Sequence, residues 1–260
     1  MATVATPTCS EEFVEVAGER VHLLRGGVGD PLLILHHDIG NPGWLPFYED
    51  LARRFAVYVP SHPGYGQSSR PEWMRSVRDV AVVYQWLLAD LGLEGVSLVG
   101  LGFGGWIAAE MATMAPRAFR RLVLVGAMGL KPSEGEILDQ SLVNYIDYAR
   151  AGFHDQSKFD QIFGSEPPTS QLETWDINRE MTFRIAWKPY MYSQTLPYLL
   201  GGVRAPALVV WGREDRVVPL ECGERYARLL PNARLEIVHG CGHCVEMERP
   251  EELARLVGGT

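Results

Sequence analysis

The residues best suited to chemistry in this sequence are an aspartate and a histidine near its carboxyl end and a glycine-rich turn that precedes them. Asp215 stands in WGREDRVVP and His243 in GCGH, each after an apolar run typical of a buried strand. An aspartate that accepts a hydrogen bond from an imidazole orients the ring as a general base. The sequence therefore predicts Asp215 and His243 as a catalytic pair.

The glycine-rich turn, residues 100–105 (GLGFGG), satisfies two motifs. As G-x-G-x-x-G it would bind a dinucleotide, which requires the first βαβ unit and an acidic residue about 20 positions later. Several apolar segments precede this turn, and the next one, residues 121–126 (RLVLVG), contains no acid. As G-x-S-x-G it is a nucleophile elbow, a strained turn from strand to helix, with Gly102 at the serine position. The elbow is favoured, so we predict no cofactor.

Gly102, Asp215 and His243 follow one another in the order nucleophile, acid, histidine that such an elbow requires. Glycine relieves a backbone strain of about 1 to 3 kcal/mol, so it is the expected replacement where no nucleophile is needed. It is equally consistent with a serine enzyme inactivated in the laboratory. Without a hydroxyl at position 102 no acyl-enzyme forms there, and His243 would activate a water or an acidic O–H or C–H group of the substrate.

Short apolar runs that end in turn residues alternate with helical periods, which predicts parallel βαβ units after an antiparallel start. The antiparallel start is a hairpin of residues 13–16 and 20–24. The runs typical of strands buried on both faces are residues 31–36, 55–60, 95–100, 121–126, 206–212 and 234–239. The predicted helices are residues 45–54, 76–91, 106–115, 220–230 and 250–257.

Residues 131–204 interrupt this alternation. The segment is predicted to be helical and holds eleven of the 26 aromatic residues of the chain. Aromatic side chains typically line small-molecule pockets, so we predict a helical cap, with Tyr145 and Trp187 as pocket candidates. Residues 1–130 and 205–260 would form the core domain into which this cap is inserted.

Over nearly its whole length the chain resembles the α/β-hydrolase superfamily. The resemblance rests on LILHHDIG, PSHPGYGQS, LVGLGFGGWIA, WGREDRVVP and GCGH, in that order. It implies an α/β fold, the α/β-hydrolase fold, with a mostly parallel sheet, an antiparallel N-terminal hairpin, helices on both faces and a helical cap insertion. It also implies an oxyanion hole formed by the backbone N–H groups of Phe103 and Asp38.

The sequence departs from the pattern of the superfamily at three places. The changes near Gly102 favour natural divergence over a laboratory mutation as the origin of this glycine. They also make His37 a further pocket candidate. The departures are Gly102 in place of serine, the pair His36 and His37 followed by Asp38 in place of the usual His-Gly, and Ser61 followed by His62 in the loop that usually carries an acid.

Two groupings have the composition of metal sites. His36, His37 and Asp38 are consecutive, but adjacent side chains leaving a strand point in opposite directions. The C-x-x-C spacing of Cys241 and Cys244 occurs once in a chain with four cysteines. We predict no metal, and we interpret the cysteines as semi-buried thiols.

Charge and hydropathy limit the partners. Lys and Arg number 24 against 32 Asp and Glu, and the net charge of −8 opposes binding to nucleic acid or to an anionic membrane. Residues 1–12 lack the pattern of a secretory signal, and no run of 18 apolar residues occurs. We predict a cytoplasmic protein with a small-molecule partner, and the sequence leaves the oligomeric state open.

The predicted function is that of a hydrolase-like enzyme that acts on a small apolar or aromatic carbonyl compound. His243 and Asp215 would serve as the base pair without a covalent intermediate, in hydrolysis or in a lyase, isomerase or cofactor-free oxygenase reaction. Two alternatives stay open at this point. One is a binding protein that has lost chemistry, and the other is a serine esterase inactivated at position 102.

Overall fold

The computed structural model describes residues 9–259 of the chain. Residues 1–8, which belong to the segment where the sequence predicts no secretory signal, lie outside the described residues. Within residues 9–259, no helix has both the length and the apolar composition needed to cross a membrane.

The described chain is built on one sheet of eight strands in the order β1-β2-β4-β3-β5-β6-β7-β8. The pairs β1–β2 and β2–β4 are antiparallel, and all later pairs are parallel. This confirms the predicted fold class and the N-terminal hairpin. The strands are β1 (Ser10–Val16), β2 (Glu19–Gly26), β3 (Asp30–Leu35), β4 (Phe55–Pro60), β5 (Ser97–Leu101), β6 (Arg121–Val125), β7 (Ala207–Gly212) and β8 (Ala233–Val238).

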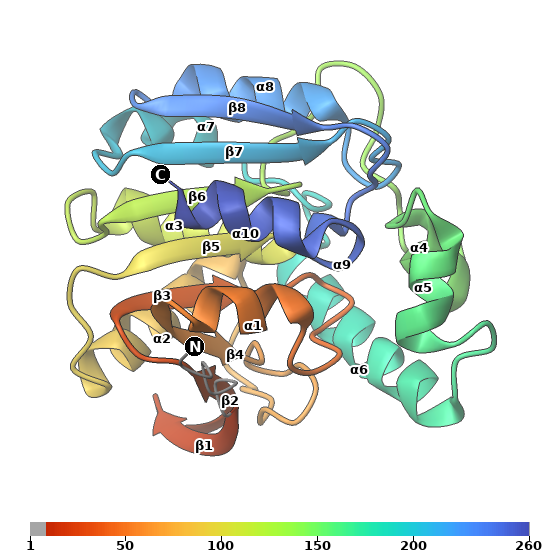
Figure 1. Ribbon diagram of the computed structural model, residues 1–260, viewed down its shortest axis with the longest axis horizontal. Coiled ribbons are helices and arrows are strands. Elements are labelled where there is room, and N and C mark those ends of the chain that lie inside the picture. The colour runs from red at the N-terminus through yellow and green to blue at the C-terminus, as the bar shows by residue number, and fades with distance from the viewer. Residues whose placement is uncertain (1–8, 260) are drawn as a thin grey trace, which may run out of the picture.

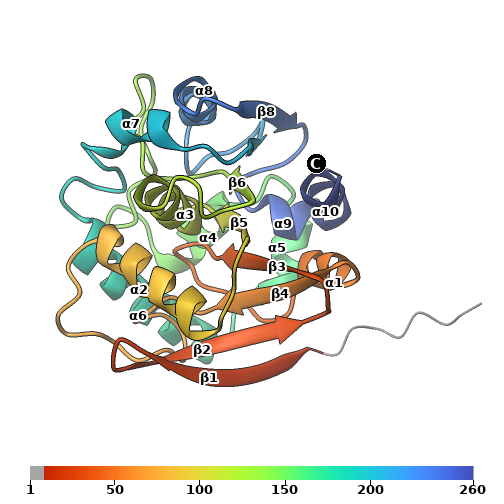
Figure 2. The same cartoon turned by 90° about the vertical axis from the view of Figure 1, so that its left-hand side faces the viewer.

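Helices cover both faces of the sheet, as Figures 1 and 2 show. On one face α1 (Pro46–Ala52) packs against α10 (Pro250–Gly258), and on the other α2 (Val77–Asp90) packs against α3 (Phe103–Met114). The helix α8 (Leu220–Leu229) contacts β7 and β8 on the same side as α3. Because both faces are covered, β5 and β7 are buried along their whole length.

Between β6 and β7 the chain forms α4 (Tyr145–Ala151), α5 (Gln156–Phe163), α6 (Thr169–Ala186), α7 (Leu196–Leu199) and the 3₁₀ helix η1 (Leu200–Gly202). Figure 1 shows α4, α5 and α6 beyond the carboxyl ends of the strands. Their aromatic residues Phe153, Phe159, Phe163 and Trp175 pack against one another. The helix α7 instead packs against α3. The division into a core and a cap with limits at 131 and 204 stays a prediction.

Candidate active site

Gly102 lies between the last residue of β5 and the first residue of α3, at the carboxyl edge of the sheet. Its backbone angles are φ 51° and ψ −110°, a conformation that residues with a side chain rarely adopt. The backbone approaches closely here: a Cβ at Gly100 would lie 2.5 Å from the carbonyl oxygen of Gly104. The chain therefore makes a tight strand-to-helix turn with a glycine at its centre, and the identity of this turn as a nucleophile elbow stays a prediction.

Asp215 and His243 come together although 28 residues separate them in the chain. Nδ1 of His243 lies 2.7 Å from Oδ2 of Asp215, and both side chains are buried. The other oxygen of Asp215 accepts the backbone N–H groups of Val217 and Val218 at 2.8 and 2.9 Å. These bonds fix the carboxylate, which in turn fixes the imidazole with Nδ1 as donor and Nε2 directed elsewhere.

Opposing influences set the pKa of His243. Burial is the largest single influence and lowers it, but the charge and hydrogen bond of Asp215 together with the charges of Asp38 and Glu246 raise it by more. The net result is a pKa above the usual 6.5. A raised pKa makes the imidazole a stronger base, provided that the pH is high enough to leave it neutral.

The ring of His37 occupies the space that a serine side chain would need. A Cβ built on Gly102 would overlap Nδ1 of His37 and would lie 2.9 Å from Nε2 of His243. The two rings are 4.8 Å apart between centroids. Nδ1 of His37 and Nε2 of His243 are both buried, and neither has a hydrogen-bond partner within the described part of the chain. Two unpartnered imidazole nitrogens therefore converge beside Gly102.

Glu246 holds His37 from the other side. Nε2 of His37 lies 3.2 Å from each carboxylate oxygen and donates to Oε2. The Glu246 side chain is fully buried in α9 (Val245–Glu248), directly after the His243 loop. His37 and Glu246 are 209 residues apart in the sequence, so they form a contact between the loop after β3 and the carboxyl end of the fold.

His36 and His62 secure the loop that carries His37. Nδ1 of His36 donates to the carbonyl of His37 at 2.6 Å, and Nε2 of His36 accepts the backbone N–H of His62 at 2.9 Å. The His62 ring donates from Nε2 to the carbonyl of His36 and accepts the Tyr84 hydroxyl at Nδ1. Burial lowers the pKa of His36 to about 3 and also lowers that of His62. Both rings are therefore neutral, and their hydrogen bonds hold the loop in place.

The backbone groups expected to form the oxyanion hole lie on adjoining segments. Phe103 is the first residue of α3, so its N–H has no acceptor inside the helix. The loop of Asp38 is joined to the elbow because the N–H of Gly104 donates to the carbonyl of His36 at 2.9 Å. The Asp38 carboxylate is buried and accepts a hydrogen bond from the side chain of Gln140. Its Oδ2 thus faces the segment between β6 and α4, while its charge still acts on His243, whose pKa it raises.

The cavity beside the two unpartnered nitrogens is small. It has a volume of about 10 Å³, roughly enough for one water molecule, and is lined by residues that include His37, His243 and Tyr148. Tyr145 lines a second cavity of the same size between Asp38 and α6. Trp187 lines neither cavity. It follows α6 directly with 41% of its surface exposed and packs on Phe183 and Tyr190, and its role as a pocket residue stays a prediction.

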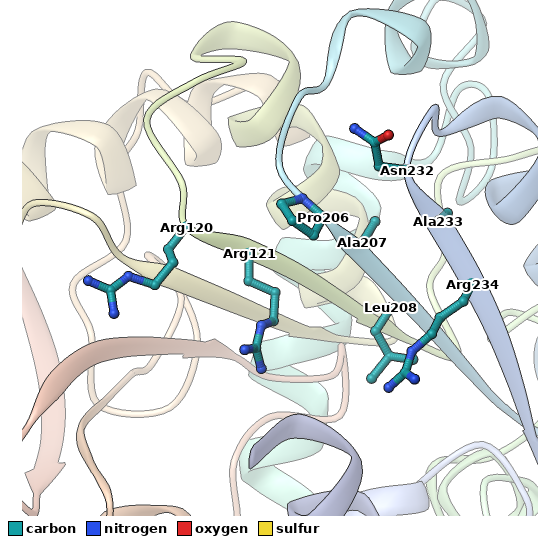
Figure 3. Close-up of a pocket in the computed structure, with 8 residues that line it drawn as sticks. All are labelled: Arg120, Arg121, Pro206, Ala207, Leu208, Asn232, Ala233 and Arg234. Carbon is teal, nitrogen blue, oxygen red and sulfur yellow. The ribbon is translucent and has the colours of Figure 1, made fainter. Parts of the chain in front are cut away.

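A larger cavity lies at the opposite edge of the sheet. Figure 3 shows Arg120, Arg121 and Arg234 around it, at the amino ends of β6, β7 and β8. It has a volume of about 330 Å³. Ligands of open α/β sheets bind at the carboxyl ends of the strands, and the elbow, the acid and the histidine all lie there. We therefore place the candidate active site at the small cavity.

One group of side chains has the composition of a metal site. His37, Cys244 and Glu246 are buried, and their nitrogen, sulfur and oxygen atoms lie within 4.8 Å of one another. Burial raises the pKa of the Cys244 thiol well above its usual value, and the nearby carboxylates raise it further. His36 and Asp38, the neighbours of His37 in sequence, instead bond to a backbone carbonyl and to Gln140.

Sequence reasoning missed two buried glutamates. Glu246 binds His37, and Glu248 accepts the backbone N–H groups of Gly242, His154 and Asp155 at 2.6, 3.1 and 2.8 Å. Their segment, CVEMERP, has the composition of an exposed acidic helix start. The one available signal is its position directly after the candidate catalytic histidine.

The chain belongs to the α/β-hydrolase fold family, whose model matches residues 30–250. It is 29% identical to a 2-hydroxy-6-oxononadienedioate/2-hydroxy-6-oxononatrienedioate hydrolase of Paraburkholderia phymatum over 92% of this chain and 89% of that protein. It is 30% identical to a 2-hydroxymuconate semialdehyde hydrolase of Pseudomonas putida over 97% of this chain and 94% of that protein. A crystal structure of a membrane phospholipase A is similar with a TM-score of 0.82 and 26% identity, covering 96% of this chain and 85% of that one.

Proposed function

We propose that this protein is a hydrolase-like enzyme for small carbonyl compounds that uses His243 and Asp215 as its general base and no serine nucleophile. The relatives named above are hydrolases of 2-hydroxy-6-oxo acids and of 2-hydroxymuconate semialdehyde. Compounds of this chemical class, in which a ketone or aldehyde is joined to a short unsaturated acid, are the substrates that we propose. They are the products expected when an aromatic ring is opened.

One observation carries the proposal. The pair of His243 and Asp215 is intact at 2.7 Å, and Nε2 of His243 is buried without a partner beside Gly102. A buried nitrogen without a hydrogen-bond partner lowers the stability of a fold by about 1 to 3 kcal/mol. Such groups occur in active sites, where they take part in the reaction. If the pair had no function, we would expect another group to provide a hydrogen-bond partner for Nε2.

In the proposed reaction a water takes the place of the serine hydroxyl. Nε2 of His243 removes a proton from this water as its oxygen attacks the carbonyl carbon of the substrate. The N–H groups of Phe103 and Asp38 stabilise the negative charge that develops on the carbonyl oxygen. Asp215 stays ionised and stabilises the imidazolium.

Substrate entry requires a displacement of α4. The cavity beside His243 has a volume of about 10 Å³ and is closed on one side by Tyr148 and Ala149 of α4 and by its C-cap Gly152. A six-carbon acid does not fit in this space. We therefore propose that the structure is the closed form and that α4 moves before the substrate binds.

The alternatives predicted from the sequence are less well supported. A serine esterase that lost only its hydroxyl would keep room for that hydroxyl, whereas here His37 fills the space. A binding protein without chemistry would have no need of an unpartnered Nε2 on a carboxylate-oriented imidazole. Each alternative nevertheless predicts a distinct result in the assays below.

The first test uses 2-hydroxymuconate semialdehyde, whose consumption is followed by absorbance. We expect turnover by the natural sequence and a loss of about 10² to 10⁴ in kcat for His243→Ala, the usual contribution of a general base. His239→Ala is the matched control, because His239 is an exposed histidine four residues away. Binding of the compound without turnover would support the binding protein instead.

The second test uses a short-chain chromogenic ester with Gly102→Ser, alone and combined with His243→Ala. We expect no gain of esterase activity, because the added side chain overlaps His37. A rate in Gly102→Ser that exceeds the rate of the unaltered chain and is lost in the double variant would support the inactivated serine esterase.

A further inference from the structure

A second histidine–carboxylate pair faces the first across Gly102. His37 and Glu246 form it, with Nε2 of His37 3.2 Å from the carboxylate and Nδ1 directed at the elbow. In the first pair Nδ1 of His243 binds Asp215 and Nε2 is directed at the elbow. Each carboxylate therefore binds the nitrogen that points away from the elbow and leaves the other nitrogen free to react.

The two carboxylates differ in how their charges are compensated. Asp215 accepts two backbone N–H groups in addition to the imidazole. Glu246 is 0% exposed, and His37 is its one hydrogen-bond partner within residues 9–259. A buried carboxylate without such donors needs a cation beside it. His37 is therefore placed to be the partner that Glu246 needs, whereas Asp215 has two backbone donors besides His243.

We propose that His37 is a second catalytic histidine, which acts as the general acid opposite His243 and takes the position of the missing serine. The inference rests on the proposed function, because it concerns the same reaction. It narrows the substrate class to carbonyl compounds whose leaving atom, such as carbon, needs a proton before it departs.

In the proposed reaction His243 and His37 act in turn. His243 takes one proton from water, a bond forms between the water oxygen and the carbonyl carbon, and the carbonyl electron pair moves onto oxygen. When that pair returns, the bond from the carbonyl carbon to the leaving atom breaks, and the leaving atom takes the proton from Nδ1 of His37. One water is consumed, and a carboxylic acid and a protonated leaving group are released. The proton on His243 then passes to His37 by way of water.

Substrates that differ in their leaving group provide the test. The variant is His37→Gln, which can still donate to Glu246 but cannot act as an acid. On 2-hydroxymuconate semialdehyde, where the leaving atom is carbon, we expect kcat to fall by about 10² to 10⁴. On 4-nitrophenyl acetate, whose leaving group departs as a stable anion, we expect a change of less than about threefold. A structural role for His37 would lower both rates together.

The control variants separate this inference from the proposed function. His243→Gln removes the base and should lower both rates, and His239→Gln should lower neither. Equal rates for His37→Gln and the natural sequence on the semialdehyde would overturn the role of His37 and leave the proposed function standing. No turnover of either compound by the natural sequence would overturn both.

A measurement on the unaltered protein covers the case in which His37→Gln does not fold. Long-range ¹H–¹⁵N spectra report which ring nitrogens carry protons. Above the pKa of His243, we expect protons on both nitrogens of His37 and on Nδ1 alone of His243. An unprotonated Nδ1 in His37 would overturn the inference. So would one zinc ion per chain that is lost in Cys244→Ser, because a metal on Nε2 would replace the bond to Glu246.

Discussion

At the elbow, two separate effects oppose a side chain on Gly102. Its φ of 51° is unfavourable for residues with a Cβ, by about 1 to 2 kcal/mol. The overlap with His37 adds about 1 to 3 kcal/mol, as overpacking does in other buried sites. We expect Gly102→Ala to lower the free energy of unfolding by the sum of both effects, measured by urea denaturation.

Gly95→Ala is the matched control. Gly95 has a φ of 60°, and a Cβ added there would meet no atom within 4 Å. It should show the backbone effect alone. Equal losses in the two variants would mean that His37 moves aside without cost, and His37 would then not be a fixed part of the site.

The raised pKa of His243 predicts how the stability of the fold depends on pH. Because the folded pKa lies above the unfolded value near 6.5, the pair with Asp215 stabilises the fold fully below that value. That contribution is lost as the pH rises through the folded pKa. In Asp215→Asn the burial of His243 dominates and its pKa should fall below 6.5, so the sign should reverse. NMR titration of His243 in both proteins measures the shift, and an unchanged pKa in Asp215→Asn would contradict this account.

The order of Gly102, Asp215 and His243 along the chain is the basis for predicting these residues, because each lies in the turn or loop that follows a strand. The position of His37 could not be predicted in this way. The sequence shows that it follows β3, but the direction of its ring depends on the bonds of His36 and His62 in space. Glu246 was beyond reach because nothing local links it to a residue 209 positions earlier.

At the scale of elements, α9 connects the His243 loop to the start of α5. Its last residue, Glu248, accepts N–H groups from Gly242 and from His154 and Asp155. Each donor left unpaired in a buried place costs about 1 to 3 kcal/mol. We expect Glu248→Ala to lower the free energy of unfolding by about 2 to 5 kcal/mol in a thermal or urea melt.

The control for this prediction is Glu251→Ala, which removes an exposed glutamate from the first turn of α10. A change of at most a few tenths of a kcal/mol is expected there. If Glu248→Ala were as mild, water would be satisfying the three N–H groups, and the carboxylate would not be holding the loop.

The strands were predictable because short apolar runs alternate with helical periods along the chain, and the observed bounds of β3, β4 and β6 differ from the predicted ones by at most one residue. The four-residue helix α9 has no periodicity that a pattern could detect. The helices between β6 and β7 were predicted as a group and not one by one. Their aromatic residues pack on each other, as at Phe153 and Phe159, and the sequence does not tell such contacts from pocket walls.

At the scale of the whole molecule, the closed cavity lies between the middle of the sheet and the helix α4, which must move for a substrate to enter. The strands β5 and β6 lie in the middle of the sheet, whereas α4 closes the cavity from one side. Amides that exchange through local opening do so faster than those that require global unfolding. We expect hydrogen exchange measured by mass spectrometry to be faster in α4 than in β5, and to slow in α4 when a substrate-like acid is bound. Protection of α4 equal to that of β5 would contradict entry by this route.

The overlap between position 102 and the His37 ring also constrains the history of this chain. A serine at position 102 and a histidine in this orientation at position 37 would overlap and so exclude each other. Whether a substitution at one position is favourable or unfavourable therefore depends on the residue at the other. An ancestor with the serine must have lost it before, or together with, the arrival of this ring. Return to serine chemistry would then require two simultaneous changes, and this sign epistasis makes the departure from the serine mechanism hard to reverse.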